Sequence, residues 1–293
     1  MTFQPSNLPT FAPLVRFLTF IRFSHTVFAL PFALGSMIVA ASSSGGFPGW
    51  RLFALILLCM VFARTAAMTF NRVTDWEIDK RNPRTAGRHK LLGKGAAIAT
   101  CLLASLLFIA TAALINPLCL LLSPVALALV FFYSLTKRFT HAAQFFLGLA
   151  LSASPVGAWL AVTGSFAWPP IILAAGVLCW VAGFDMIYAT QDVEADRREG
   201  LHSMVIRLGV PGALSLAGWL HLLMLVALVL FGLTASLGPI YFLGLIPVPL
   251  LLLYEHRIAR TLDVEKINRA FFETNAVIGL LFVAITAADR IFR

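Results

Sequence analysis

The sequence is a series of apolar segments, each about 20 residues long, that alternate with short polar loops. An α-helix of that length rises about 30 Å, which is the thickness of the hydrocarbon core of a bilayer. Of the 293 residues, 60% are hydrophobic and 12% are charged, so one soluble core could not bury the apolar surface. We therefore expect an all-α polytopic membrane protein whose outer helix faces contact lipid.

Nine segments are long and apolar enough to be predicted as membrane-spanning helices. The fourth and the eighth are the least regular, because Pro124, Pro247 and Pro249 interrupt them, although proline is tolerated in membrane helices. We expect the helices to surround a central cavity that opens to the cytoplasmic side. The predicted spans are residues 25–42, 52–70, 96–115, 117–135, 143–163, 170–190, 211–233, 238–254 and 271–288.

The whole chain, residues 1–293, is predicted to form one transmembrane domain, because no stretch has the composition of a soluble domain. Residues 1–23 mix large apolar side chains with Arg16 and Arg22, a pattern typical of a short interfacial helix. A cleaved signal peptide is a competing interpretation, because Arg22 precedes an apolar run that ends in small residues. Removal of that run would leave eight helices.

The basic residues predict the orientation of the chain. If the N-terminus is cytoplasmic, all but four of the 22 Lys and Arg residues fall in cytoplasmic segments, the exceptions being Arg51, Arg64, Arg290 and Arg293. This asymmetry obeys the positive-inside rule and favours an odd number of helices. The net charge of +9 is thereby explained by topology and phosphate binding, so we expect no nucleic-acid partner.

Eight of the 13 acidic residues fall within two stretches, 75–79 and 185–199, each at the end of an apolar segment. In the first, Asn71, Asp75 and Asp79 are spaced by four residues, so on a helix they drift by only about 80° and share one face. A similar stripe is predicted in the second stretch, and we expect both stripes to face one cavity. The second stripe consists of Asp185, Tyr188, Asp192 and Asp196.

The two stripes favour a site for a hard cation. Oxygen ligands without Cys or His are typical of Mg²⁺, which a few carboxylates normally share with substrate phosphates. An alternative is that these acids are solvated helix ends balanced by neighbouring bases. Two complete motifs in matching positions on one membrane face favour the metal site. The predicted metal ligands are Asn71, Asp75, Asp79, Asp192 and Asp196.

Basic residues lie close to both motifs, as expected where Mg²⁺ and cationic side chains together bind a diphosphate. Arg84 and Arg88 follow the first motif, and Lys137-Arg138 follows the fourth apolar segment. Arg64 lies seven residues before the first motif and returns to nearly the same helix face. We predict that these bases take part in substrate binding as a group.

These residues resemble the signatures of the UbiA superfamily of intramembrane aromatic prenyltransferases. Asn71, Asp75 and Asp79 match its N-x-x-x-D-x-x-x-D segment on the second helix. Asp192 and Asp196 match its D-x-x-x-D segment on the sixth. The resemblance covers the whole chain, and the combination of motifs is highly specific. Further similarity lies in Asn82-Pro83-Arg84-Thr85-Ala86-x-Arg88, in Tyr133-x-x-Thr136-Lys137-Arg138 with Gln144, and in Gly183-Phe184-Asp185 one turn before Tyr188.

Within this superfamily the chain is similar to the bacterial 4-hydroxybenzoate polyprenyltransferase-like group, on the segments that begin at His25 and at Asp192. That group includes enzymes for 1,4-dihydroxy-6-naphthoate in the futalosine route to menaquinone. Two departures are visible: the loop after Arg88 lacks a proline common in the family, and Ser134 stands where proline often follows Tyr133. Both concern loop geometry more than chemistry.

The resemblance implies transfer of a polyprenyl group from polyprenyl diphosphate to the ring of an aromatic acid, in ubiquinone or menaquinone biosynthesis. It implies two Mg²⁺ ions that bridge the diphosphate. Asn71, Asp75 and Asp79 would hold one ion, and Asp192 and Asp196 the other.

The resemblance also implies roles for the remaining residues. The two loop arginines and Lys137 would stabilise the leaving group, and Tyr188 would contact the substrate. Arg138 would bind the acceptor carboxylate, and Asp185 or Asp192 would assist loss of the ring proton. The enzyme is expected in a bacterial inner membrane, with its site facing the cytoplasm and the prenyl tail in the bilayer.

Two other classes stay open on sequence grounds. A cation-coupled secondary transporter would place its acids near the middle of the bilayer on broken helices. A non-catalytic membrane scaffold would not need two complete acidic motifs. Metal-dependent release of diphosphate from a prenyl diphosphate would separate these classes from a prenyltransferase.

Overall fold

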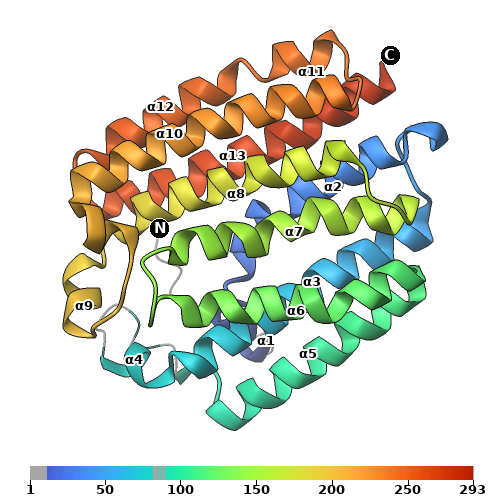
Figure 1. Ribbon diagram of the computed structural model, residues 1–293. Helices are drawn as coiled ribbons and strands as arrows, with labels where there is room; N and C mark the ends of the chain where they lie inside the picture. Colours follow the sequence, from blue (N-terminus) through green and yellow to red (C-terminus); the bar gives the residue numbers. More distant parts are fainter. Residues whose placement is uncertain (1–11, 82–84, 86, 88–89, 293) are drawn as a thin grey trace.

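Helices make up every regular element in the part of the chain that the computed structural model describes, residues 12–81, 85, 87 and 90–292 (Figure 1). Eight segments are long and apolar enough to cross a membrane, and a shorter apolar helix covers Thr26–Ala40. The prediction of a polytopic all-α protein is confirmed, with eight full-length spans in the described residues in place of nine. The long helices are α3 (Trp50–Thr74), α5 (Lys94–Ile115), α6 (Pro117–Thr136), α7 (Ala143–Thr163), α8 (Trp168–Ala189), α10 (Met204–Thr234), the pair α11–α12 (Pro239–Ala259) and α13 (Val264–Ile291).

The N-terminal region forms short helices before the first long one. α1 (Ala12–Phe20) lies within residues 1–23, where the sequence predicts a short helix, and α2 (Leu30–Ala40) follows a 3₁₀ turn at Phe23–Phe28. Arg22 has left-handed backbone angles, φ 47° and ψ 54°, so the chain changes direction there. The first predicted span, 25–42, is therefore shorter as a helix than the roughly 20 residues that cross a bilayer.

The eighth predicted span is two helices. α11 (Pro239–Gly244) ends before α12 (Pro247–Ala259) begins. Pro247 and Pro249 lack amide hydrogens, so the backbone ladder cannot continue through them as it does in an ordinary helix. Pro124, by contrast, lies inside an unbroken α6.

α8 lies between α10 and α7, while α2 contacts both α7 and α13 (Figure 1). α3 packs against α5, and α6 packs against α7 and α5. Leu103 and Leu106 of α5 and Leu121 of α6 are 58%, 66% and 71% exposed, as expected of side chains that face lipid. Trp50 and Trp168 begin α3 and α8 and are highly exposed, which is typical of an aromatic belt at one membrane interface. The chain is an integral membrane protein.

Both acidic motifs fall where a long helix ends. α3 is followed by the short helix α4 (Trp76–Arg81), and α8 is followed by α9 (Val193–Arg198). The prediction of one continuous helical stripe through each motif is wrong. Asp75 (φ −91°, ψ 12°) and Asp192 (φ −106°, ψ 0°) leave the helical region of backbone angles and turn the chain.

The two acidic segments, residues 75–79 and 192–196, are called the first and second acidic loops. They nevertheless have matching backbone geometry. The amide of Asp79 donates to the carbonyl of Asp75 over 2.7 Å, and the amide of Asp196 donates to the carbonyl of Asp192 over 2.8 Å. Each bond keeps the second aspartate one turn after the first, so both pairs retain a common direction. The two motifs, which the sequence puts in matching positions at helix ends, are therefore alike in backbone geometry as well.

Candidate active site

A polar cavity of about 320 Å³ is lined by both acidic loops and by residues of α3, α6, α8 and α13. Most of the predicted site residues face it, so the fold brings together groups from widely separated parts of the chain. Arg138 is not among its lining residues. Arg84 and Arg88 lie outside the described residues. The predicted residues that line the cavity are Arg64, Asn71, Asp75, Asp79, Lys137, Asp185, Tyr188, Asp192 and Asp196.

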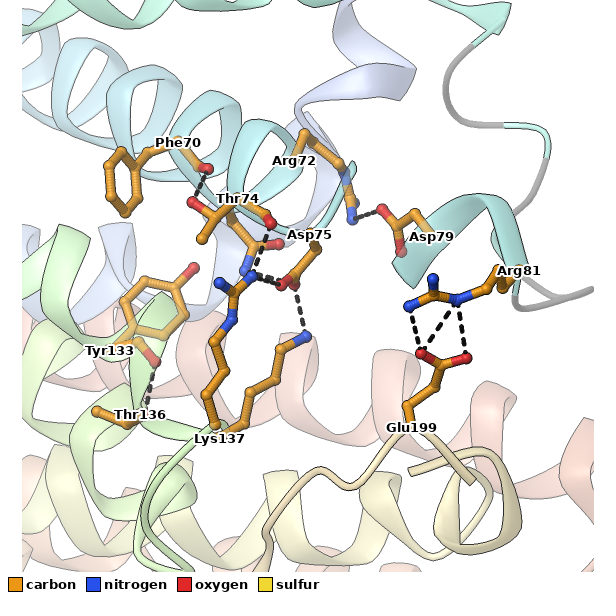
Figure 2. A network of polar contacts seen from close by, with 12 residues as sticks. Phe70, Arg72, Thr74, Asp75, Asp79, Arg81, Tyr133, Thr136, Lys137 and Glu199 are labelled. Carbon is orange, nitrogen blue, oxygen red and sulfur yellow. Dashed lines mark hydrogen bonds and ion pairs between the residues drawn. The ribbon is translucent and has the colours of Figure 1, made fainter. Parts of the chain in front are cut away.

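Asp75 is a deeply buried carboxylate with two cationic partners (Figure 2). Lys137 Nζ lies 2.5 Å from its Oδ2, and Arg138 Nη2 lies 3.2 Å from its Oδ1. The same Arg138 nitrogen donates to the backbone carbonyl of Thr74 over 2.6 Å. Asn71 Nδ2 also donates to Asp75 Oδ2 over 3.4 Å. The charge of Asp75 is thus balanced by the two bases that directly follow α6.

Asp79 lies beside a second buried base (Figure 2). Arg72 Nη1 is 3.5 Å from Asp79 Oδ2, and the Nε of Arg72 donates to the carbonyl of Phe20 over 3.4 Å. Sequence reasoning missed Arg72. Its spacing of seven residues from Asp79 was the available signal, because such residues share a helix face.

The second motif gathers carboxylates on the other side of the cavity. Asp185 of α8 lies close enough to Asp192, Asp196 and Lys137 for electrostatic interaction. All three carboxylates line the cavity. Their mutual repulsion favours a cation between them, since like charges at short range raise each other's energy.

An ion pair ties the two acidic loops together (Figure 2). Arg81 Nε donates to both carboxylate oxygens of Glu199, over 3.1 and 3.2 Å, and Arg81 Nη2 donates to Oε2 over 2.6 Å. This two-pronged geometry is the most specific contact between a guanidinium and a carboxylate. The hydrogen bond that Arg81 donates to Glu199 raises the pKa of Arg81 above its ordinary value. The pair joins the last residue of α4 to the residue that follows α9.

Four aromatic side chains form one wall of the polar cavity: Phe28, Phe184, Tyr188 and Phe271. The ring centroids of Tyr188 and Phe271 are 4.6 Å apart. The Phe28 ring lies 5.4 Å from that of Phe184 and 5.3 Å from that of Phe271. Aromatic faces attract cations, so this wall can stabilise positive charge in the cavity. Sequence reasoning predicted Tyr188 as a site residue, but it could not select the three Phe residues from the 25 in the chain.

A second, apolar cavity of about 190 Å³ adjoins the polar one and is lined mainly by α3, α5, α6 and α7. Arg64, Tyr133 and Leu151 line both cavities and mark their junction. Arg64 Nη2 donates to the carbonyl of Arg22 over 3.4 Å, while its buried Nε has no partner among the described residues. Gly157 of α7 lines the apolar cavity, and a Cβ at this position would meet no atom within 4 Å.

The donor chemistry of the polar cavity fits a divalent cation that is shared with substrate. Within the described residues, no three Asp, Glu, His or Cys side chains converge as a preassembled metal cage. Mg²⁺ normally takes one or two carboxylates and completes its coordination with water and phosphate oxygens. The two pairs of aspartates fit such an open site better than a closed structural one.

Comparisons with known proteins agree with this geometry. Residues 29–282 match the profile of the UbiA prenyltransferase family. The 4-hydroxybenzoate octaprenyltransferase of Vibrio vulnificus is 31% identical over 258 residues, which cover 87% of this chain and 89% of that protein. The enzyme of the same name from Nitrosospira multiformis is 32% identical over 243 residues, which cover 82% and 83%.

Solved structures show the same fold. The apo structure of a UbiA homolog from Aeropyrum pernix K1 superposes with a TM-score of 0.80 at 28% identity and covers 90% of this chain and 98% of that one. A UbiA homolog from Archaeoglobus fulgidus bound to GPP and Mg²⁺ gives a TM-score of 0.71 at 22% identity, covering 95% and 100%.

Proposed function

The chain belongs to the UbiA prenyltransferase family and is a membrane-embedded prenyltransferase, and we propose that it transfers a polyprenyl group from polyprenyl diphosphate to the ring of a 4-hydroxybenzoate-type aromatic acid. The observation that supports this proposal most strongly is the junction of two cavities. One is polar and rich in carboxylates and bases, and the other is apolar and lies among the membrane-spanning helices. The first suits a diphosphate and the second a prenyl tail. The product would enter ubiquinone or menaquinone biosynthesis, and the whole chain would act as one catalytic domain.

Two Mg²⁺ ions bound with the substrate would supply Lewis-acid stabilisation of the charge that grows on the diphosphate. Asn71, Asp75 and Asp79 would hold one ion, and Asp192 and Asp196 the other. These residues offer oxygen donors at two sides of one cavity, which supports this assignment.

Basic side chains would hold the leaving group. Lys137 lines the cavity, so its ammonium can turn from Asp75 to a diphosphate oxygen as the allylic C–O bond breaks. Arg72 lines the same cavity and adds a second cation beside the first motif. Arg84 and Arg88, which lie outside the described residues, are proposed from their sequence positions to join this group.

The allylic cation would form beside the aromatic wall, whose ring faces lower the energy of positive charge. The electron-rich carbon ortho to the acceptor hydroxyl would then form the new C–C bond. Asp185 lies one turn before Tyr188 in the same cavity and is our first candidate to accept the ring proton. Asp192 is the second candidate.

The apolar cavity would take the first part of the prenyl tail. On α6 its lining runs from Cys119 to Tyr133, which corresponds to about 21 Å along the helix axis. Gly157 keeps this path open from the side of α7. A longer tail would continue into the bilayer between the helices.

The resemblance of the sequence to the family suggested Arg138 as the residue that binds the acceptor carboxylate. The geometry favours Arg64 for this role instead. Arg138 already bonds Asp75 and the carbonyl of Thr74. Arg64 lies at the junction of the cavities and carries a buried donor without a partner among the described residues. Arg64→Gln is expected to raise the KM for the acceptor about tenfold or more and to leave the KM for the prenyl diphosphate nearly unchanged. Equal changes in the KM for the acceptor and the KM for the prenyl diphosphate would contradict this assignment.

The proposed location is a bacterial inner membrane, with the polar cavity facing the cytoplasm. Lys and Arg are concentrated in the loops on that side, which supports the orientation. The proposed partners are the polyprenyl diphosphate, the aromatic acid and the surrounding lipid.

The decisive assay supplies the protein in membranes with Mg²⁺, a polyprenyl diphosphate, and either 4-hydroxybenzoate or 1,4-dihydroxy-6-naphthoate, and identifies the product by mass. We expect prenylated 4-hydroxybenzoate. If a product formed only from the naphthoate, the proposed acceptor would be wrong and the proposed reaction class would stand. Absence of both products and of diphosphate release would overturn the proposed reaction.

A further inference from the structure

Behind the aromatic wall, α12 carries two adjacent polar residues that reach two different helices. Glu255 is 1% exposed, and its Oε1 accepts a hydrogen bond from Asn275 Nδ2 of α13 over 2.7 Å. His256 Nε2 lies 3.0 Å from Nδ1 of the buried His221 of α10. None of these four residues lines the polar cavity. They form a polar cluster that the proposed reaction does not use directly.

The contact between Glu255 and Asn275 leaves two buried oxygens without a donor. Asn275 is fully buried, and its Nδ2 gives one hydrogen to Glu255 and the other to the backbone carbonyl of Phe271, over 2.8 Å. Glu255 Oε2 and Asn275 Oδ1 have no hydrogen-bond partner among the described residues. A carboxylate oxygen and an amide oxygen both accept and neither donates, so an ionised Glu255 cannot satisfy its neighbour. Two orphan acceptors at one buried contact are costly.

No base balances a negative charge on Glu255 within the described structure. Its side chain takes part in none of the ion pairs found there. Lys266 and Arg269 of the neighbouring α13 pair with Asp263 and Glu273 instead. An ionised acid on a membrane-spanning helix needs a partner, because lipid and apolar side chains do not solvate it.

A single proton resolves both problems. If Glu255 Oε2 carries a proton, the side chain is neutral and its O–H can donate to Asn275 Oδ1. Acid and amide then exchange two hydrogen bonds, and the four polar atoms of the two side chains all have partners. The proton comes from solvent during folding and stays on Glu255, so no other group changes.

We propose that Glu255 is protonated in the folded protein and that the resulting acid–amide pair with Asn275 positions the aromatic wall of the active site. The connection runs through Phe271, whose carbonyl accepts from Asn275 and whose ring packs 4.6 Å from that of Tyr188. Only the positioning role rests on the proposed prenyl transfer; the protonation of Glu255 is independent of it.

The histidine pair supports the wall at a neighbouring point. A Cβ on Gly183 would lie 2.5 Å from the ring of His221, so that ring packs directly on the α8 backbone beside Phe184. His256 fixes the other side of the His221 ring. Adjacent residues of α12 therefore reach both the Phe184 and the Phe271 parts of the wall.

Asp289 of α13 is a matched control with the opposite requirement. It is 1% exposed, and its two oxygens accept the amide hydrogens of Gly238 and Tyr241, over 2.8 and 3.2 Å. Asp289 must supply two hydrogen-bond acceptors, whereas protonated Glu255 supplies one acceptor and one donor. A glutamine at position 255 would supply the same acceptor and donor, but an asparagine at position 289 would supply only one of the two acceptors. The same carboxyl-to-amide exchange is therefore expected to be tolerated at Glu255 and harmful at Asp289.

The protonation is tested by infrared difference spectra of the full-length protein in lipid nanodiscs at neutral pH. Glu255→Gln is expected to remove a carbonyl-stretch band of a protonated carboxylic acid and to leave the carboxylate bands unchanged. Asp289→Asn is expected to leave the protonated-acid band in place. Loss of carboxylate intensity alone in Glu255→Gln would overturn the proposal.

The positioning role is tested by the division of prenyl diphosphate between transfer and hydrolysis by water. Glu255→Gln is expected to leave the thermal midpoint nearly unchanged and to stay within about twofold of wild type in kcat and in the ratio of prenyl alcohol to prenylated acid. Glu255→Ala is expected to lower kcat and to raise the ratio of prenyl alcohol to prenylated acid about tenfold, because a displaced wall no longer excludes water.

Each outcome of these measurements is informative. If Glu255→Ala does not fold, Asn275→Leu in the background of Glu255→Leu tests the same wall with an apolar pair. An unchanged product ratio in a folded variant without the acid–amide pair would overturn the positioning role. Loss of activity in Glu255→Gln would show that the charge matters and would overturn the protonation. A wild-type protein without prenyl transfer would refute the proposed function, while the infrared result would still decide the protonation.

Discussion

The two acidic loops have the same sequence pattern and backbone geometry, but the charged groups placed beside them by the described part of the structure differ. Each follows a long helix and reads D-x-E-x-D, and in each the carbonyl of the first aspartate accepts the amide hydrogen of the second. In the first loop, Lys137 and Arg138 already contact Asp75. In the second, Asp185 adds a third carboxylate within electrostatic reach of the loop.

Under the proposed function, a duplicated motif would then have two different roles. The first loop would be held ready by bases that can turn from Asp75 to an incoming diphosphate. The second loop, with Asp185 beside it, would help to bind a divalent cation with that diphosphate. The polar cavity would then close around its substrate from two unlike sides.

The largest expected effect comes from neutralising the first aspartate of either loop. Asp75→Asn and Asp192→Asn are each expected to lower kcat at least about 100-fold in a transfer assay with labelled prenyl diphosphate. Excess Mg²⁺ should restore part of the activity of Asp192→Asn, because mass action offsets weak metal binding. It should restore less in Asp75→Asn, where Lys137 and Arg138 also lose their partner. Full activity in either variant, with normal expression in membranes, would break the comparison.

A smaller loss of activity is expected when Lys137, which contacts Asp75 of the first loop, is replaced. Lys137→Gln should lower kcat about 10- to 100-fold, because the leaving group loses a cationic donor and Asp75 loses one of its two cationic partners. Lys137→Arg keeps the charge and should retain more activity. Steady-state kinetics at saturating Mg²⁺ distinguish the two variants. Equal losses in both would point to a packing role for the lysine.

The contact between the loops is expected to contribute less again. Arg81→Gln and Glu199→Gln should each lower kcat/KM about threefold, because an exposed ion pair is weak and holds the loops together only in part. The charge swap Arg81→Glu with Glu199→Arg should restore most of the loss. Lys80→Gln is the control, since its exposed pair with Glu77 stays within α4. A swap that is worse than either single variant would exclude a direct pairing role.

The smallest effect is expected at the middle acids of the two D-x-E-x-D patterns. Glu77 and Glu194 are 64% and 91% exposed, and among the described residues each pairs with a base on its own short helix, Lys80 or Arg198. Glu77→Gln and Glu194→Gln should change kcat/KM by less than about twofold. Measurement of both sets the baseline for the other variants. A large loss at one of them would assign it a role that its position does not suggest.

The long helices could be predicted from the sequence because apolar length is a local property of the chain. The predicted span 143–163 coincides with α7 (Ala143–Thr163), and the predicted span 96–115 lies within α5 (Lys94–Ile115). The gathering of the two motifs at one cavity also followed, since basic loops place both on the same membrane face.

The contacts that distinguish the two loops could not be predicted in the same way. Lys137 reaches Asp75 across 62 positions of sequence, and Arg81 reaches Glu199 across 118. Such pairs depend on how the helices pack, and helical spacing carries no information about it. The break of each helix at its first aspartate was also missed, because the four-residue spacing fits a straight helix equally well.

The central claim is that the two acidic loops jointly bind a prenyl diphosphate through divalent cations. The most direct test is calorimetric titration of a prenyl diphosphate into the purified protein in nanodiscs, with Mg²⁺ or with EDTA, for the wild type, Asp75→Asn and Asp192→Asn. We predict that the wild type binds the prenyl diphosphate with Mg²⁺ but not with EDTA, and that the affinity is strongly reduced in each variant. Equal binding by all three proteins, unaffected by EDTA, would contradict the claim.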